Sequence, residues 1–188
     1  MLKKGSLFVI SGPSGVGKNT VINEFLKNNA DVKLSISCTT RHPRGGEKDG
    51  INYFFLTKEE FENDIKQGKF LEWAEFNGNF YGTKQEYVEK TLANQQDIIL
   101  EIDTQGAMQI KKKLPDAVLI FIAPPSREVL ENRLKGRGTE SDEVVKKRLN
   151  IAIGELEKMK DFDFVVVNDD LSNAAKELEN IIKRKAAK

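Results

Sequence analysis

The sequence predicts an α/β protein in which a parallel β-sheet is covered by helices on both faces. Four short runs are rich in valine, isoleucine, leucine and phenylalanine and lack the polar alternation of a half-exposed strand. Helical patterns separate these runs, which favours right-handed crossovers between parallel strands. The predicted strands are Leu7–Ser11, Asp97–Ile102, Ala117–Ile122 and Phe164–Val167.

Five helices are expected around these strands. One follows the first strand, one follows the second, two separate the third from the fourth, and one ends the chain. In chain order they are Asn19–Asn28, Gln105–Lys113, Ser126–Lys135, Asp142–Lys160 and Ala174–Lys185.

Two segments interrupt the alternation of strands and helices. Residues 37–84 are rich in glycine, arginine, glutamate and aromatic residues, and we expect one helix there, Lys58–Gln67, together with short antiparallel strands. Thr57 and Glu60 predict a capping box at the start of that helix. The second segment, around Ser126–Glu157, is helical and highly charged. We interpret both as insertions into the sheet order.

The overall charge excludes several classes of partner. The 188 residues contain 30 Lys and Arg against 29 Asp and Glu, so no net field attracts nucleic acid or a membrane surface. Any bound anion must be held by a local cluster. No apolar run has the length of a membrane span. Cys38 is the single cysteine, which excludes an internal disulfide and favours a reducing, cytoplasmic compartment.

A glycine-rich loop after the first strand predicts a phosphate site. Its glycines and lysine have Walker A spacing between a strand and a helix, where backbone N–H groups and the helix N-terminus attract phosphate. The alternative is a glycine-rich turn that happens to contain a lysine. The loop and its helix start are Gly12, Pro13, Ser14, Gly15, Val16, Gly17, Lys18, Asn19 and Thr20.

Asn19 departs from the phosphate-loop pattern. The position after the lysine is usually serine or threonine, whose hydroxyl binds Mg²⁺, but here Asn19 precedes Thr20. We therefore expect Mg²⁺ to be held mainly by ATP oxygens and water. Thr20 and Asp103 are the candidate protein ligands.

The inserted segment carries a second candidate anion site. Arg41 and Arg44 lie on a loop rich in proline and glycine, with Glu47 and Tyr53 close behind them. Guanidinium groups match the oxygens of a phosphate, a tyrosine hydroxyl adds a donor, and a glutamate can hold an arginine in position. This pattern favours a pocket for a terminal phosphate dianion over a solvated basic loop.

Taken together, residues 39–56 resemble the signature of the guanylate kinase family. Thr39-Thr40-Arg41 is followed by Arg44, Glu47, Gly50, Tyr53 and Phe55-Leu56 at the spacing of that family. The resemblance extends in order through most of the chain. Further matching segments are Phe70–Ala74, Gly78–Thr83, Leu100–Asp103 with Gln105–Gly106, Ile122–Ser126, Gly136–Glu140 and Val167–Asp170.

The resemblance implies a GMP site in the inserted segment. Arg41, Arg44, Tyr53 and Tyr81 would hold the phosphate, with Glu47 supporting an arginine. The guanine would be surrounded by Glu72, Ser37, Thr83, Glu101 and Asp103. A carboxylate suits the N1 and N2 donors of guanine and a hydroxyl suits O6, whereas adenine would leave buried polar groups unpaired.

It also implies an ATP site and a lid. Arg133, Arg137 and Arg148 in the charged insertion would close over the ATP phosphates, and Asn168 with Asp169 would form the adenine-side loop. Lys18, Arg41, Arg137 and Arg148 are the expected catalytic residues. The implied division is a P-loop kinase core at 1–36, 85–125 and 158–188, a GMP-binding lobe at 37–84 and a lid at 126–157.

Several of these residues have simpler interpretations. Glu72 could face solvent from an amphipathic strand, and the tyrosines could be core aromatics with wet hydroxyls. Asp103 could cap the helix that follows it instead of approaching Mg²⁺. The arginines of the charged insertion could be ordinary solvated residues.

The expected activity is transfer of the γ-phosphoryl group of ATP to GMP or dGMP, with Mg²⁺, in a monomer or homodimer. Because the acceptor phosphate is already largely anionic at neutral pH, no general base is needed. One alternative is another nucleoside monophosphate kinase. The other is a catalytically silent guanylate-kinase-like binding module, against which the presence of Lys18 argues.

Overall fold

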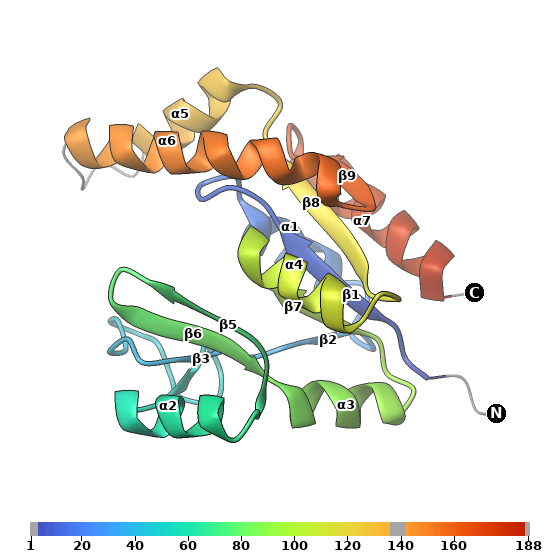
Figure 1. Cartoon of the computed structure of the whole chain (residues 1–188). Coiled ribbons are helices and arrows are strands. Elements are labelled where there is room, and N and C mark those ends of the chain that lie inside the picture. The colour runs from blue at the N-terminus through green and yellow to red at the C-terminus, as the bar shows by residue number, and fades with distance from the viewer. Residues whose placement is uncertain (1–3, 136–141, 187–188) are drawn as a thin grey trace.

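The computed structural model describes residues 4–135 and 142–186. Its centre is a parallel sheet in the order β2-β7-β1-β8-β9 (Figure 1). Four of these strands confirm the prediction from the apolar runs, and the fifth, β2, was not predicted. The strands are β1 (Leu7–Ser11), β2 (Lys33–Leu34), β7 (Ile98–Glu101), β8 (Val118–Ala123) and β9 (Phe164–Val167).

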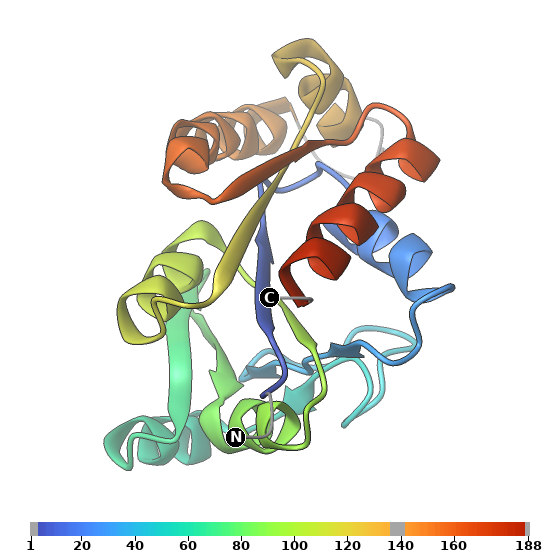
Figure 2. The ribbon, with the colours of Figure 1, turned by 90° about the vertical axis from the view of Figure 1, so that its right-hand side faces the viewer.

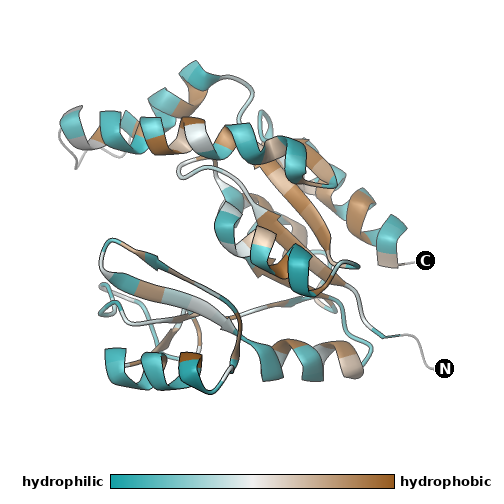
Figure 3. Cartoon of the chain, viewed as in Figure 1, coloured by the Kyte–Doolittle hydropathy of each residue, from teal (hydrophilic) through white to brown (hydrophobic). Residues whose placement is uncertain are grey.

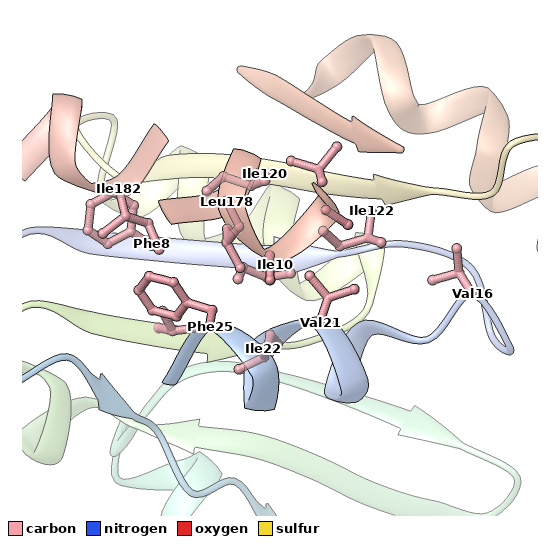
Figure 4. Close-up of a cluster of buried hydrophobic side chains, with 14 of the residues drawn as sticks. Phe8, Ile10, Val16, Val21, Ile22, Phe25, Ile120, Ile122, Leu178 and Ile182 are labelled. Carbon is pink, nitrogen blue, oxygen red and sulfur yellow. The ribbon is translucent and has the colours of Figure 1, made fainter. Parts of the chain in front are cut away.

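Helices cover both faces of this sheet because side chains along β1 alternate between two cores. Phe8 and Ile10 pack with α1 (Lys18–Leu26) and α7 (Leu171–Ala186), as Figure 4 shows. Leu7 and Val9 join the opposite core, to which α3 (Gln85–Ala93) and α4 (Thr104–Lys113) contribute. Figure 2 shows α1 and α7 on one side of the sheet and α4 on the other. The strands are therefore buried on both faces, as their composition predicts.

A second sheet lies beside the first, in the order β4-β3-β6-β5. It is built from β3 (Cys38–Thr39), β4 (Phe54–Phe55), β5 (Phe70–Phe76) and β6 (Asn79–Lys84). The expectation that all these short strands are antiparallel is wrong in one place, since β3 and β4 run parallel. The long loop between β3 and β4 carries the chain back to the start of the sheet, which a tight hairpin turn would not do.

The helix of this segment, α2 (Lys58–Lys66), begins as predicted. The Thr57 hydroxyl accepts from the Glu60 backbone N–H, and the Glu60 carboxylate accepts from the Thr57 backbone, so both halves of the capping box are present. Phe61 of α2 is fully buried and stacks on Phe70 and Phe80 at centroid distances of 4.2 and 5.4 Å. The second sheet thus has a small core of its own.

The charged insertion forms α5 (Arg127–Lys135) and α6 (Asp142–Glu157), and η1 (Lys158–Asp161) continues from α6 as a 3₁₀ turn. These helices lie across the carboxyl end of β8 in Figure 1. Figure 3 shows apolar residues concentrated on the central strands, with mostly hydrophilic colour on α2 and α6. No helix within the described residues is long and apolar enough to cross a membrane.

Candidate active site

The glycine-rich loop runs between β1 and α1 at the carboxyl edge of the central sheet. Gly12 has φ 149°, and a Cβ at that position would lie 2.3 Å from the Ile122 carbonyl oxygen of β8. Only glycine fits so close to a neighbouring strand. The loop then ends at Gly17, in the left-handed conformation, and Lys18 opens α1. This is the strand–loop–helix geometry that binds phosphate in Walker A proteins.

Lys18 is held by the loop itself. Its ammonium donates to the Gly12 carbonyl at 2.7 Å. Burial lowers the pKa of Lys18, while the carboxylates of Glu101, Glu155 and Asp103 oppose that shift. The lysine therefore lies in a partly desolvated site, where weak solvent screening strengthens its attraction for a phosphate and where three nearby carboxylates oppose that attraction.

Asn19 does not extend into the loop. With its amide nitrogen assigned toward the carboxylate, Asn19 donates to Glu101 Oε1 at 2.9 Å and also to Oε2. Glu101 ends β7, and burial raises its pKa while Lys18 lowers it. Asn19 thus ties the start of α1 to the end of β7. Thr20, one residue further on, is exposed in the first turn of α1.

Two side chains of α6 reach the phosphate loop at Ser14. Arg148 donates to the Ser14 hydroxyl at 2.9 Å, and the Ser14 backbone N–H donates to Glu155 Oε2 at 3.3 Å. Burial raises the pKa of Glu155, and the Ser14 N–H and Lys18 counteract that rise. The Glu155 carboxylate therefore accepts from a loop N–H group, and phosphate oxygens accept from N–H groups of this kind in Walker A proteins.

Arg133 and Asn168 brace the loop from behind. Arg133 donates to the carbonyls of Val16 at 3.2 Å and Asn168 at 2.9 Å. The buried Asn168 amide also donates to the Val16 carbonyl at 2.8 Å. Asp169, which follows, is exposed. In this structure Arg133 and Asn168 therefore contact the loop backbone.

The second predicted anion site is preorganised around Glu47. Arg41 donates to both carboxylate oxygens of Glu47 at 3.0 and 2.9 Å, and the Arg44 backbone N–H donates to the same carboxylate at 2.7 Å. Arg41 also lies 5.4 Å from the centre of the Tyr53 ring, and Tyr53 packs edge-on against Tyr81 at 6.3 Å. The hydrogen bond with Glu47 raises the pKa of Arg41 and lowers that of Glu47.

Glu72 is buried, with 4% of its surface exposed, so the solvent-facing interpretation is wrong. Its Oε1 accepts from the Thr83 hydroxyl on the neighbouring strand at 2.7 Å. Burial raises the pKa of Glu72 to about 7, against the lowering effect of the Thr83 hydrogen bond. A buried carboxylate with one oxygen still available is suited to accept hydrogen bonds from a ligand.

Asp103 does cap a helix, as the simpler interpretation allows. Its side chain accepts from the Gly106 backbone N–H at 2.7 Å and begins α4.

A cavity of about 560 Å³ lies between the glycine-rich loop, the second sheet and α6. Nine predicted residues line it: Gly12, Ser14, Lys18, Ser37, Tyr53, Glu72, Tyr81, Glu101 and Asp103. Thr83 lies behind Glu72, and Arg41 lies beside Tyr53 at the margin. The predicted residues that do not line the cavity are Pro13, Gly15, Val16, Gly17, Asn19, Thr20, Arg41, Arg44, Glu47, Thr83, Arg133, Arg148, Asn168 and Asp169. Arg137 lies outside the described residues.

Sequence reasoning missed part of the lining. Ala74, Phe76 and Gly82 come from the second sheet, Thr104 and Gln105 from the start of α4, and Ile151, Gly154, Glu155 and Lys158 from α6 and η1. Phe76 and Ile151 are large apolar residues with 52% and 45% of their surface exposed. The sequence does not separate Ile151 from the other apolar residues of α6, because its exposure is known only from the structure. Nothing in the sequence distinguishes Glu155 from the other acids of α6.

A larger cavity, of about 660 Å³, lies between the second sheet and α3. Lys69, Lys84, Phe54 and Leu56 are among its lining residues, and it contains none of the predicted site residues. Volume alone therefore does not single out a site, and the smaller cavity is the candidate because predicted polar groups converge on it.

The acids near Lys18 fit a hard cation. Glu101, Asp103 and Glu155 all act on Lys18 electrostatically, and carboxylate oxygens are the ligands that Mg²⁺ prefers. No group of three or more metal-ligating side chains was found over residues 4–135 and 142–186. A partial protein shell of this kind is compatible with a cation carried largely by a polyphosphate.

Comparison with known proteins identifies the family. The guanylate kinase family model matches residues 4–185. A guanylate kinase of Clostridioides difficile is 51% identical over 96% of this chain and 88% of its own length, and one of Prochlorococcus marinus is 48% identical over 97% and 98%. The crystal structure of guanylate kinase from Anaplasma phagocytophilum superposes with a TM-score of 0.81 at 33% identity, covering 99% of this chain and 88% of that one. The chain belongs to the guanylate kinase family.

Proposed function

We propose that the 560 Å³ cavity is where this guanylate kinase transfers the γ-phosphoryl group of ATP to GMP, giving ADP and GDP. The observation that carries the proposal is that Lys18 lines the same cavity as Glu72, Tyr53 and Tyr81. A phosphate-binding lysine and a buried base-reading carboxylate on one cavity suit a reaction between two nucleotides.

On the acceptor side, Arg41, Arg44, Tyr53 and Tyr81 bind the GMP phosphate. The Glu47 contact supports this role, because it holds Arg41 rigid before the ligand arrives. Glu72 accepts from guanine N1–H and N2–H, supported by Thr83. The remaining base-side residues are Ser37, Glu101 and Asp103.

On the donor side, the Lys18 ammonium binds the ATP phosphates together with the loop Gly12–Thr20, whose residues other than Pro13 offer backbone N–H groups. Arg148 and Arg137 neutralise the transferring group, while Arg133, Asn168 and Asp169 support the adenine side. The 2.9 Å contact of Arg148 with Ser14 supports the first assignment. Mg²⁺ bound to ATP would neutralise charge on the phosphate oxygens, with Thr20 or Asp103 as its protein ligand.

The chemistry is positioning and charge neutralisation. Two polyanions must meet in line, and the cations Lys18, Arg41 and Arg148 lower the repulsion between them. Residues 37–84 and 126–157 act as a GMP-binding lobe and a lid that close on the core (1–36, 85–125 and 158–188) and exclude water from the phosphoryl group. The reducing environment that suits the single Cys38 supports a cytoplasmic enzyme.

A coupled assay for ADP release tests this function, with ATP and Mg²⁺ and with GMP, AMP, UMP and CMP offered in parallel. We expect ADP formation with GMP far above that with the other three acceptors. Turnover that is equal with AMP and GMP would contradict the Glu72 assignment. A folded, ATP-binding protein that is silent with every acceptor would favour a binding module.

A further inference from the structure

Strand β5 is an edge of the second sheet, so one side of its backbone has no neighbouring strand among residues 4–135 and 142–186. The side chain of Gln109, on α4, takes that place at Trp73. Its Oε1 accepts from the Trp73 N–H at 3.3 Å and its Nε2 donates to the Trp73 carbonyl at 2.9 Å. A primary amide thus offers the donor and acceptor that another strand would provide.

Lys113 adds a second contact on the same edge. Its ammonium donates to the Leu71 carbonyl and, at 3.4 Å, to the Phe70 carbonyl. Leu71 and Trp73 flank Glu72, so backbone groups on both sides of the base-side carboxylate are held by α4. We call Gln109 and Lys113 together the edge brace.

The same face of α4 also contacts the Glu72 side chain. A Cβ at Gly106 would lie 2.7 Å from Glu72 Oε2, so the helix passes against the carboxylate with room for hydrogen only. Gly106, Gln109 and Lys113 have the i, i+3, i+7 spacing of one helix face. Figures 1 and 2 show α4 lying between the central sheet and β5.

Helix α4 is in turn fixed to the central sheet. It follows β7 directly, Asp103 caps its first turn, and Ala107 and Ile110 are fully buried in the core that includes β1 and β7. Helix α4 is therefore fixed relative to the central sheet that carries the phosphate loop. The edge brace joins this helix to β5, so it also fixes the distance from the loop to Glu72.

We propose that Gln109, assisted by Lys113, is a positioning residue that sets the Glu72 carboxylate for guanine. The inference rests on the proposed role of Glu72 as the reader of N1–H and N2–H. Gln109 does not line the 560 Å³ cavity and acts through the Trp73 backbone. Without the brace, β5 can shift on α4, and a carboxylate displaced by even a fraction of an ångström loses its alignment with two donors at once.

The test compares Gln109→Met, which keeps side-chain length but removes both polar groups, with Lys113→Met and the matched control Lys112→Met. Lys112 is exposed on the same helix. Steady-state kinetics are measured with GMP and with inosine monophosphate, which lacks the N2 amine. We expect Gln109→Met to raise KM for GMP about fivefold to tenfold, with kcat and KM for ATP changed less than twofold. The preference for GMP over inosine monophosphate should fall by a similar factor.

Unchanged kinetics with GMP in both variants would overturn the proposal, as would equal losses with both acceptors and with ATP, which indicate a purely structural contact. If Gln109→Met does not fold, Lys113→Met carries the same comparison against Lys112→Met. The wild-type protein separates the two claims, since a wild type that ignores GMP contradicts the proposed function itself.

Discussion

Glu72 is a buried acidic side chain that lines the 560 Å³ cavity. It is buried beside Thr83, and burial brings its pKa to about 7, close to physiological pH. Guanine offers only donors at N1 and N2, so the ionised carboxylate is the binding form. With Glu72 in its proposed role as guanine reader, the pH therefore sets the fraction of free enzyme whose carboxylate is ionised and able to bind GMP.

We expect kcat/KM for GMP to rise between pH 6 and 8 as Glu72 loses its proton. Glu72→Gln should lower this parameter about 10- to 100-fold, because the amide gives up charged hydrogen bonds to the base. The variant should keep only the pH dependence that the GMP phosphate contributes near pH 6. Steady-state kinetics across this range check the result, and an unaltered profile in Glu72→Gln would exclude Glu72 as its origin.

The same burial costs stability. Between pH 4.5 and 7 the unfolded chain has lost a proton that the folded chain keeps at Glu72, so stability falls as pH rises through this window. At pH 8 the cost reaches about 3 kcal/mol. Glu72→Gln should therefore melt several degrees above wild type at pH 8 and close to it at pH 4.5. Calorimetry at the two pH values checks this, and an equal shift at both would point to packing instead.

At the scale of elements, α6 and the phosphate loop are joined by opposite charges at one residue. Arg148 holds the Ser14 hydroxyl, and Glu155 holds its N–H. A phosphate bound at this loop, as proposed, would compete with the carboxylate for the same donor and for the field of Lys18. Helix α6 therefore contacts the loop through both side chains, and its Glu155 carboxylate would repel the phosphates of the proposed ATP ligand.

Glu155→Gln should lower KM for ATP about threefold to fivefold, because the incoming phosphates no longer meet a negative charge. KM for GMP should change little. Glu157→Gln, an exposed neighbour on α6, is the matched control. A raised KM for ATP in Glu155→Gln would instead indicate that the carboxylate assists binding, for example through Mg²⁺.

Gly106→Ala separates stability from function on α4. Alanine favours the helix by about 1 kcal/mol over glycine, but its methyl group would meet the Glu72 carboxylate. We expect the melting temperature of the variant to lie at most a few degrees below that of the wild type. We also expect KM for GMP to rise at least tenfold. Unaltered GMP kinetics would mean that the Glu72 carboxylate can bind GMP from a second side-chain position.

These elements differ in how far sequence predicted them. The apolar runs of β1, β7, β8 and β9 have no polar alternation, and they were found with bounds within a residue or so. Two elements were missed for physical reasons. Strand β2 is two residues long, too short for a period-2 pattern, and α3 has no side-chain cap to mark its start.

The lining of the candidate cavity was predictable where chemistry and local motif coincide, as at Lys18, Tyr53 and Glu72. It was not predictable where the chain meets itself across long separations. Glu155 lies 141 residues from Ser14, and Gln109 lies 36 from Trp73. The local sequence around an acid or amide on a helix surface does not indicate which distant backbone group that side chain will contact.

The whole molecule places three structural units around one cavity. The β1–α1 loop, the second sheet and α6 each contribute lining residues. Exposed Phe76 of β5 and Ile151 of α6 both line it, so apolar surface is available to be buried as these units approach. A ligand on one unit should therefore favour the arrangement that binds the other.

We expect ADP and GMP together to raise the melting temperature by more than the sum of their separate effects. The radius of gyration from small-angle X-ray scattering should decrease most with both present. Phe76→Ser should weaken the synergy, whereas Phe54→Ser, exposed on the same sheet but outside this cavity, should not. Strictly additive melting shifts would mean that the two nucleotides bind independently.

Cys38 supplies a natural probe of these movements. It is the single thiol, it is fully buried in β3 of the second sheet, and burial raises its pKa to about 11. A thiol reagent should therefore react faster in molecules whose second sheet has opened, and the labelling rate reports that opening without any engineered reporter. GMP, bound to the same sheet, should slow labelling in proportion to its occupancy. The labelling rate of Cys38 is therefore a measure of how often the second sheet, the proposed GMP-binding part of the chain, unfolds locally.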